Sequence, residues 1–284
     1  MEYRTLIDAP TLATLLSSPG VAVIDCRFDL ARPAAGRAAY LQGHLPGARY
    51  TSLDEDLSGP VAAGTGRHPL PEPAQLARRL GELGVGEGIQ VFAYDEHNGS
   101  FAARLWWLLR WLGHERVAVL DGGWTAWRAA GGPIEAGEGP PARAHFTPRP
   151  NRAAWTTADE VAAAQRRGDR LLVDARARER FTGAVEPIDK VAGHVPGARN
   201  YPFSENLGAD GRFLPAAELA RRWRSFLGDT PPERLIAMCG SGVTACHDLL
   251  ALEHAGLGGG RLYAGSFSEW IEDPARRVAV GESG

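Results

Sequence analysis

The sequence has 284 residues, which is long for one domain and comfortable for two, since domains commonly run about 100–200 residues. With 44% hydrophobic and 23% charged residues and a net charge of −3, it has the composition of an ordinary soluble protein and gives no electrostatic case for binding nucleic acid. No stretch approaches the roughly 18 apolar residues of a membrane span, and the N-terminus lacks a basic, then apolar leader. Three widely spaced cysteines without a Cys/His cluster indicate a cytoplasmic protein with no disulfide framework, metal or cofactor.

The two halves of the chain repeat the same succession of motifs. Each half has an apolar run ending in Asp and, about twenty residues later, a GH-x-PGAR motif: VAVIDCR at 21–27 with GHLPGARY at 43–50, and LLVDAR at 171–176 with GHVPGARN at 193–200. Asp25 therefore corresponds to Asp174 and His44 to His194, at offsets of 149 and 150 residues. An internal duplication is the economical explanation.

Short apolar runs alternate with helical patterns along both halves. The helical patterns cover 73–84, 99–113, 159–167, 215–227 and 243–255. This alternation predicts an α/β fold of two tandem domains, each a mostly parallel sheet with helices on both faces. We expect domains at 1–136 and 153–284, joined by a proline-rich linker at 137–152.

One cysteine lies at the junction between a predicted strand and a predicted helix. The stretch Leu235–Gly256 reads as strand, loop and helix, and Cys239 lies where the strand ends and a glycine-rich loop opens the helix. Backbone amides at such a loop favour an anion and can lower a cysteine pKa from about 8.5, which makes a thiolate nucleophile. The alternative is an inert cysteine that closes the strand. The first half has Asp95 at this position, so we expect the second domain to do the chemistry and the first to be catalytically inactive.

The sequence resembles the tandem rhodanese-domain sulfurtransferases over nearly its whole length. The resemblance rests on DCR and DAR with their GH-x-PGAR partners, DGGW at 121–124, RFTG at 180–183, YAGSFSEW at 263–270 and CGSGVTAC at 239–246. It implies that Cys239 takes sulfur from a small anionic donor and becomes a persulfide. A thiol, cyanide or a thioredoxin-like protein would then accept the sulfur.

The loop from Cys239 to Thr244 carries the indication of the donor. Its neutral Gly240-Ser241-Gly242 segment resembles the 3-mercaptopyruvate type, while Val243 and Thr244 complete the loop that would bind the transferred sulfur. The resemblance implies that Ser241 works with His68 and Asp54, although Asp56 is an equally short step away from Asp54. The alternative activity is that of a thiosulfate:cyanide sulfurtransferase.

The resemblance also assigns the residues that hold the donor's carboxylate. Arg180 matches a carboxylate-binding arginine, and its alternative is a surface ion pair with Glu179 or Glu186. The mercaptopyruvate type has a second arginine before the GH-x-PG motif, but here Ile188 stands near that place and Lys190 is the only cation of the segment. Lys190 could substitute as a point charge. By contrast, Arg27 and Arg176 are expected to pair with acidic groups inside their own domains.

A phosphatase and a non-catalytic binding module are the alternatives to a sulfurtransferase. A related phosphatase loop needs an arginine six positions after its cysteine, where this chain has Ala245, so the sequence argues against a phosphatase. A non-catalytic rhodanese-like binding module need not keep the cysteine. The second half keeps Cys239, which favours an enzyme.

Overall fold

The computed structural model describes residues 2–282, which form two compact units that each contain a parallel β-sheet. The first unit comprises the chain up to Gly59, residues 71–151 and residues 208–213. The second comprises residues 60–70, residues 152–207 and the chain from Leu214 onward. The predicted α/β class with two sheets is confirmed.

The strands of both units follow the same order. Among the described residues each sheet has five strands, ordered β1-β5-β4-β2-β3 in the first unit and β6-β10-β9-β7-β8 in the second, and every strand pair is parallel. The strands are β1 (Leu6–Ile7), β2 (Val21–Asp25), β3 (Arg49–Tyr50), β4 (Gln90–Tyr94), β5 (Val117–Leu120), β6 (Trp155–Thr156), β7 (Leu171–Asp174), β8 (Arg199–Asn200), β9 (Leu235–Met238) and β10 (Arg261–Tyr263). The duplication seen in the motifs is thus a duplication of topology.

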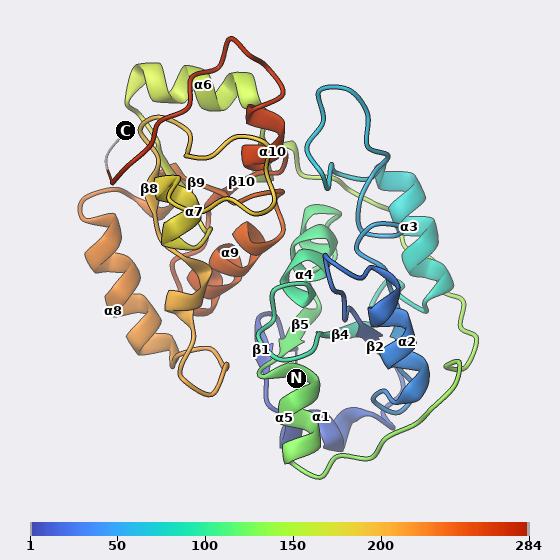
Figure 1. The fold of residues 1–284 in the computed structure, drawn as a ribbon. Coiled ribbons are helices and arrows are strands. Elements are labelled where there is room, and N and C mark those ends of the chain that lie inside the picture. The colour runs from blue at the N-terminus through green and yellow to red at the C-terminus, as the bar shows by residue number, and fades with distance from the viewer. Residues whose placement is uncertain (1, 283–284) are drawn as a thin grey trace. The chain divides into compact units, whose positions relative to one another are not determined.

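Helices connect the strands and surround each sheet, as Figure 1 shows. The first unit has α1 (Ala9–Leu15), α2 (Ala34–Gln42), α3 (Pro73–Glu82), α4 (Ala102–Trp111) and α5 (Gly123–Ala129). The second has α6 (Ala158–Arg167), α7 (Arg178–Thr182), α8 (Ala216–Leu227), α9 (Thr244–His254) and α10 (Ser266–Trp270), with short 3₁₀ turns at Arg152–Ala154, Phe203–Asn206 and Pro232–Arg234. The apolar LWWLLRWL run belongs to the almost wholly buried α4, and no helix within residues 2–282 is long and apolar enough to span a membrane.

The two Asp-x-Arg motifs make equivalent ion pairs beneath the sheets' carboxyl ends. Arg27 Nη2 lies 2.6 Å from Asp25 Oδ2, and Arg176 Nη2 lies 2.7 Å from Asp174 Oδ2. Each guanidinium also donates to the carbonyl before the following histidine, at Gly43 and Gly193. Both arginines are buried. They fix the strand to the GH-x-PG turn, which is the structural role expected for them.

The proline-rich segment at 137–152 is bound along the first unit. Its amides donate to carbonyls at the carboxyl ends of α3 and α4: Ala144 to Gly81 at 2.8 Å and Arg149 to Leu112 at 2.8 Å. The segment has the composition of a linker, but these bonds give it a fixed path over residues of the first unit.

Candidate active site

Cys239 lies directly after β9 and is 2% exposed. Its Sγ accepts a hydrogen bond from the Gly242 amide at 3.1 Å, inside the loop that leads into α9. Gly242 has φ +78°, and a Cβ there would collide with the Ala264 carbonyl oxygen, so the loop requires glycine at this position. The sulfur therefore lies at the amino end of a helix, where amides and the helix dipole favour negative charge.

The start of α10 holds the backbone of the cysteine loop in place. The Cys239 amide donates to Ser266 Oγ at 3.1 Å, while Phe267 donates to the Cys239 carbonyl and Ser268 to the Gly240 carbonyl. Ser266 is buried with φ +55°, a left-handed conformation that is uncommon for a residue with a side chain. Such strain persists only where the surrounding structure fixes it, which is typical of functional sites.

The equivalent loop of the first unit already contains an anion, the carboxylate of Asp95. Its Oδ atoms accept hydrogen bonds from the amides of Gly99, Phe101 and Ala102 at 2.8–3.2 Å. Burial raises the pKa of Asp95, and these three amides oppose that rise. The backbone bonds from Phe267 and Ser268 recur here from Trp124 and Thr125 to the carbonyls of Asp95 and Glu96. The first-unit loop is thus an anion cradle that is filled by its own side chain.

Ser241 and His68 form a hydrogen-bonded pair in the second unit. His68 Nδ1 lies 2.7 Å from Ser241 Oγ, although the two residues are 173 positions apart. Both side chains are buried. An imidazole beside a hydroxyl next to a nucleophile can carry a proton to or from a bound substrate.

The acidic partner of this pair was sought at Asp54 or Asp56, which both belong to the first unit. Asp56 is engaged there, because it accepts from the Ser52 amide and pairs with Arg79 at 2.7 Å. Desolvation and the neighbouring Glu55 raise the pKa of Asp54. The part of Asp54 in a triad stays a prediction.

Two guanidinium groups lie beside the loop. Arg180 Nη2 is 2.8 Å from Asp189 Oδ2 and 2.9 Å from Glu186 Oε1, and Arg67 forms an ion pair with the other oxygen of Asp189. A Cβ built on Gly240 would lie 2.7 Å from Arg67 Nη2 and 3.5 Å from Arg180 Nη2. Although the loop sequence is neutral, two guanidiniums lie beside it, and both are paired with carboxylates. Sequence reasoning missed Arg67, and the one available signal was its position immediately before His68.

Two segments of the chain, residues 8–130 and 157–273, match the rhodanese-like domain family. The chain belongs to the rhodanese-like sulfurtransferases. It is 49% identical to a probable 3-mercaptopyruvate sulfurtransferase of Pseudomonas aeruginosa, over 99% of this chain and all of that protein. It is 40% identical to the putative thiosulfate sulfurtransferase SseB of Mycobacterium tuberculosis, over 98% of both chains. Among solved structures, the 3-mercaptopyruvate sulfurtransferase from Leishmania major superposes with a TM-score of 0.82 at 32% identity, covering 94% of this chain and 74% of that one.

The remaining predicted residues of this sulfurtransferase lie on the exposed segment before β8 or at the start of α9. Lys190 is 59% exposed and pairs with Glu272 at 2.8 Å, so a role in donor binding would require that ion pair to break. Ile188 is also exposed. Val243 is the buried residue that precedes α9, and Thr244 is the helix's first residue. The second guanidinium beside Gly240 is therefore that of Arg67, while Lys190 is held in a separate ion pair.

A buried carboxyl lies on α9, behind the nucleophile loop of this sulfurtransferase. Asp248 accepts a hydrogen bond from Asn206 Nδ2 at 2.8 Å and is fully buried. Burial raises the pKa of Asp248 well above its ordinary value, opposed by the Asn206 bond.

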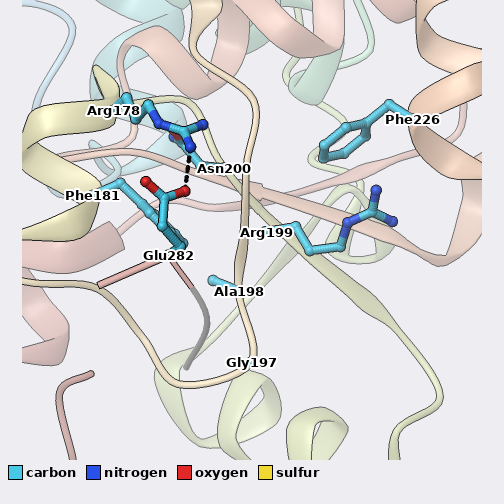
Figure 2. A pocket seen from close by; sticks show the side chains of 8 residues that line it. All are labelled: Arg178, Phe181, Gly197, Ala198, Arg199, Asn200, Phe226 and Glu282. Carbon is cyan, nitrogen blue, oxygen red and sulfur yellow. Dashed lines mark hydrogen bonds and ion pairs between the residues drawn. The ribbon is translucent and has the colours of Figure 1, made fainter. Parts of the chain in front are cut away.

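The second unit has a cavity whose lining residues do not include the cysteine loop. It measures about 410 Å³ and is lined by Arg178, Phe181, Gly197, Ala198, Arg199, Asn200, Phe226 and Glu282 (Figure 2). Arg178 and Glu282 pair across it, and the Arg199 guanidinium stacks on Phe226 at 4.2 Å. The described residues contain no group of three His, Cys, Asp or Glu side chains that could hold a metal.

Proposed function

We propose that this sulfurtransferase takes sulfur from 3-mercaptopyruvate, holds it as a persulfide on Cys239 and passes it to a thiol, cyanide or a thioredoxin-like protein. The observation that carries the proposal is the 2.7 Å Ser241–His68 pair, next to a cysteine whose sulfur accepts a loop amide. The relative from Pseudomonas aeruginosa supports the same donor.

Each step of the transfer has a group to perform it. The Cys239 thiolate attacks the donor's sulfur, the carbon–sulfur bond breaks, and its electron pair remains on the organic fragment as the enolate of pyruvate. That enolate needs a proton on carbon, which Ser241 can deliver with His68 as its proton source. The loop amides stabilise the outer sulfur of the persulfide until an acceptor removes it.

Thiosulfate is the second candidate donor, because a 40% identical relative carries that name and because Arg67 and Arg180 supply positive charge beside Gly240. The neutral loop sequence therefore does not by itself argue against a dianion. The Ser241–His68 pair favours mercaptopyruvate, since the sulfite that leaves thiosulfate needs no proton on carbon.

We also propose that the transfer takes place in the cytoplasm and only in the second domain. All three cysteines are reduced and buried, which fits a reducing compartment. The first-unit cradle is filled by Asp95, so it offers no thiol to a donor. A binding module without catalysis would have no need of the Ser241–His68 pair.

The test is steady-state turnover of the purified protein with each donor, with cyanide as acceptor. We expect a higher kcat/KM with 3-mercaptopyruvate than with thiosulfate, and no transfer from either donor in Cys239→Ser. Cys246→Ser is the control, because its sulfur contacts the Gly242 carbonyl at 3.3 Å and a hydroxyl can do the same. A higher kcat/KM for thiosulfate would overturn the donor assignment, and turnover by Cys239→Ser would overturn the nucleophile.

A further inference from the structure

The carboxylate of Asp189 bridges the two guanidiniums beside the cysteine loop. One oxygen pairs with Arg67 and the other with Arg180 at 2.8 Å, and the side chain is 1% exposed. The same two guanidiniums are the groups nearest to a Cβ placed on Gly240, the residue after the nucleophile. A carboxylate of the chain itself therefore lies where two cations converge next to Cys239.

The charges of this cluster cancel. Arg67 and Arg180 face Asp189 and Glu186, and Glu186 also lies 3.4 Å from Arg176, which is already paired with Asp174. The Arg180 guanidinium and two backbone amides hold the pKa of Glu186 below its usual range, against the effect of burial. An anion that approached this cluster with all pairs intact would meet no net positive charge. Donor binding therefore requires one of these carboxylates to move away from its arginine.

Asp189 is the carboxylate whose side chain can move away from the arginines. It belongs to the irregular segment between α7 and β8, where Val185, Ile188 and Val191 are exposed. Glu186 is tied to this segment's backbone, because its Oε1 accepts from the amides of Ile188 and Asp189. Asp189 contacts the two arginines through its side chain, while its backbone amide holds Glu186. A rotation about its side-chain bonds can therefore release Arg67 and leave Arg180 paired with Glu186 alone.

We propose that Asp189 occupies the site of the donor's carboxylate, that Arg67 is the second arginine of that site, and that the donor binds by displacing Asp189. This inference rests on the proposed function for the identity of the donor. Arg67 thereby performs the task for which the 184–192 segment has no arginine. Because the competent state is only partly populated while Asp189 is in place, the apparent affinity for the donor is reduced by that fraction.

The first test uses Asp189→Asn, which keeps the shape of the side chain and removes its charge. We expect the KM for 3-mercaptopyruvate to fall roughly tenfold with little change in kcat, as for the loss of one competing charge-assisted pair. Arg67→Ala should raise KM roughly tenfold, and Arg67→Lys should lie between Arg67→Ala and the parent protein. The matched control is Asp169→Asn, which removes a carboxylate from an exposed pair with Arg167 and should leave KM unchanged.

The second test does not depend on sulfur transfer. Iodoacetate and iodoacetamide alkylate the same thiol, but only iodoacetate carries a carboxylate, so the ratio of their rates at Cys239 reports the charge of the site. The rates would be followed by peptide mass spectrometry, which separates Cys239 from Cys26 and Cys246. We expect the iodoacetate preference to rise several-fold in Asp189→Asn and to fall in Arg67→Ala.

The outcomes separate this inference from the proposed function. If the alkylation ratio shifts as expected while 3-mercaptopyruvate is not turned over, the anion site stands and the donor assignment fails. If Asp189→Asn leaves KM unchanged or raises it, and leaves the iodoacetate preference unchanged or lowers it, Asp189 is a clamp that positions the arginines and the proposal is overturned. An unchanged ratio in Arg67→Ala removes Arg67 from the site.

Discussion

At the level of single residues, the candidate site depends on side chains that lie far apart in the sequence. Ser241 meets His68 across 173 positions and Arg67 meets Asp189 across 122. The nucleophile and its amide, by contrast, are three positions apart. The cysteine loop thus supplies the proposed nucleophile and its amide locally, while the histidine and one cation come from residues 60–70.

The Ser241–His68 hydrogen bond predicts that the two side chains act as one unit. Ser241→Ala and His68→Ala should each lower kcat with 3-mercaptopyruvate about 100-fold, the usual contribution of proton transfer by a positioned side chain. The double variant should be little slower than either single variant, since each change already removes the shared function. With thiosulfate as donor, all three variants should keep most of their activity. Additive losses in the double-mutant cycle would mean that the pair does not transfer the proton.

At the level of elements, helix boundaries follow local hydrogen bonding. The pattern at 99–113 predicts a helix that begins earlier than the observed α4, which starts at Ala102. The Asp95 carboxylate explains the difference, because it accepts the amides of Phe101 and Ala102 and fixes the preceding residues as a loop. In the second unit Cys239 stands at the corresponding position, its Sγ accepts the Gly242 amide, and α9 begins at Thr244.

Helix α6 carries a capping box that predicts a pH-dependent contribution to stability. The hydrogen bond from the Thr157 amide, first, and those from Arg152 and Thr156 lower the pKa of Glu160 from 4.5 to about 2, against the opposing effect of desolvation. A carboxyl group whose pKa is lower in the folded than in the unfolded state stabilises the fold at any pH above the unfolded-state pKa. That contribution is lost as the pH falls toward the folded-state pKa. Glu160→Ala should therefore reduce the free energy of unfolding by about 1 kcal/mol at pH 7, and by progressively less below a pH of about 4.5.

Thermal melting of the parent protein and Glu160→Ala between pH 7 and pH 3 measures this difference. Asp159→Ala is the matched control, because Asp159 is the preceding acidic residue and pairs with Arg276 at an exposed position. A melting-temperature difference that stays constant over this range would show that the charge of Glu160 makes no contribution.

At the level of the whole molecule, the sequence predicted the repeated fold and the cysteine loop of the second copy, but it missed Arg67. The duplicated Asp-x-Arg and GH-x-PG motifs were sufficient to predict two parallel sheets, because each motif links a strand to its neighbour by local contacts. Arg67 could not be found in this way, since residues 60–70 group with the second unit, and no counterpart of its ion pair exists among the repeated motifs. The proline-rich segment at 137–152 was likewise read from composition, which does not report the backbone bonds that fix its path.

The duplication leads to a stoichiometric prediction for the whole chain. Of the three cysteines, Cys246 lies within α9 and Cys26 lies at the end of β2, where burial and the charges of Asp25, Asp95 and Asp56 raise the pKa of its thiol well above the ordinary value. A thiol held in its neutral form is a poor nucleophile. Incubation with an excess of donor, removal of the donor and treatment with cyanide should therefore release one thiocyanate per chain, and none from Cys239→Ser. Cys26→Ser should leave that yield unchanged. Release of two equivalents of thiocyanate, or a sulfur adduct mapped to Cys26, would show that the first unit accepts sulfur from the donor despite the Asp95 carboxylate.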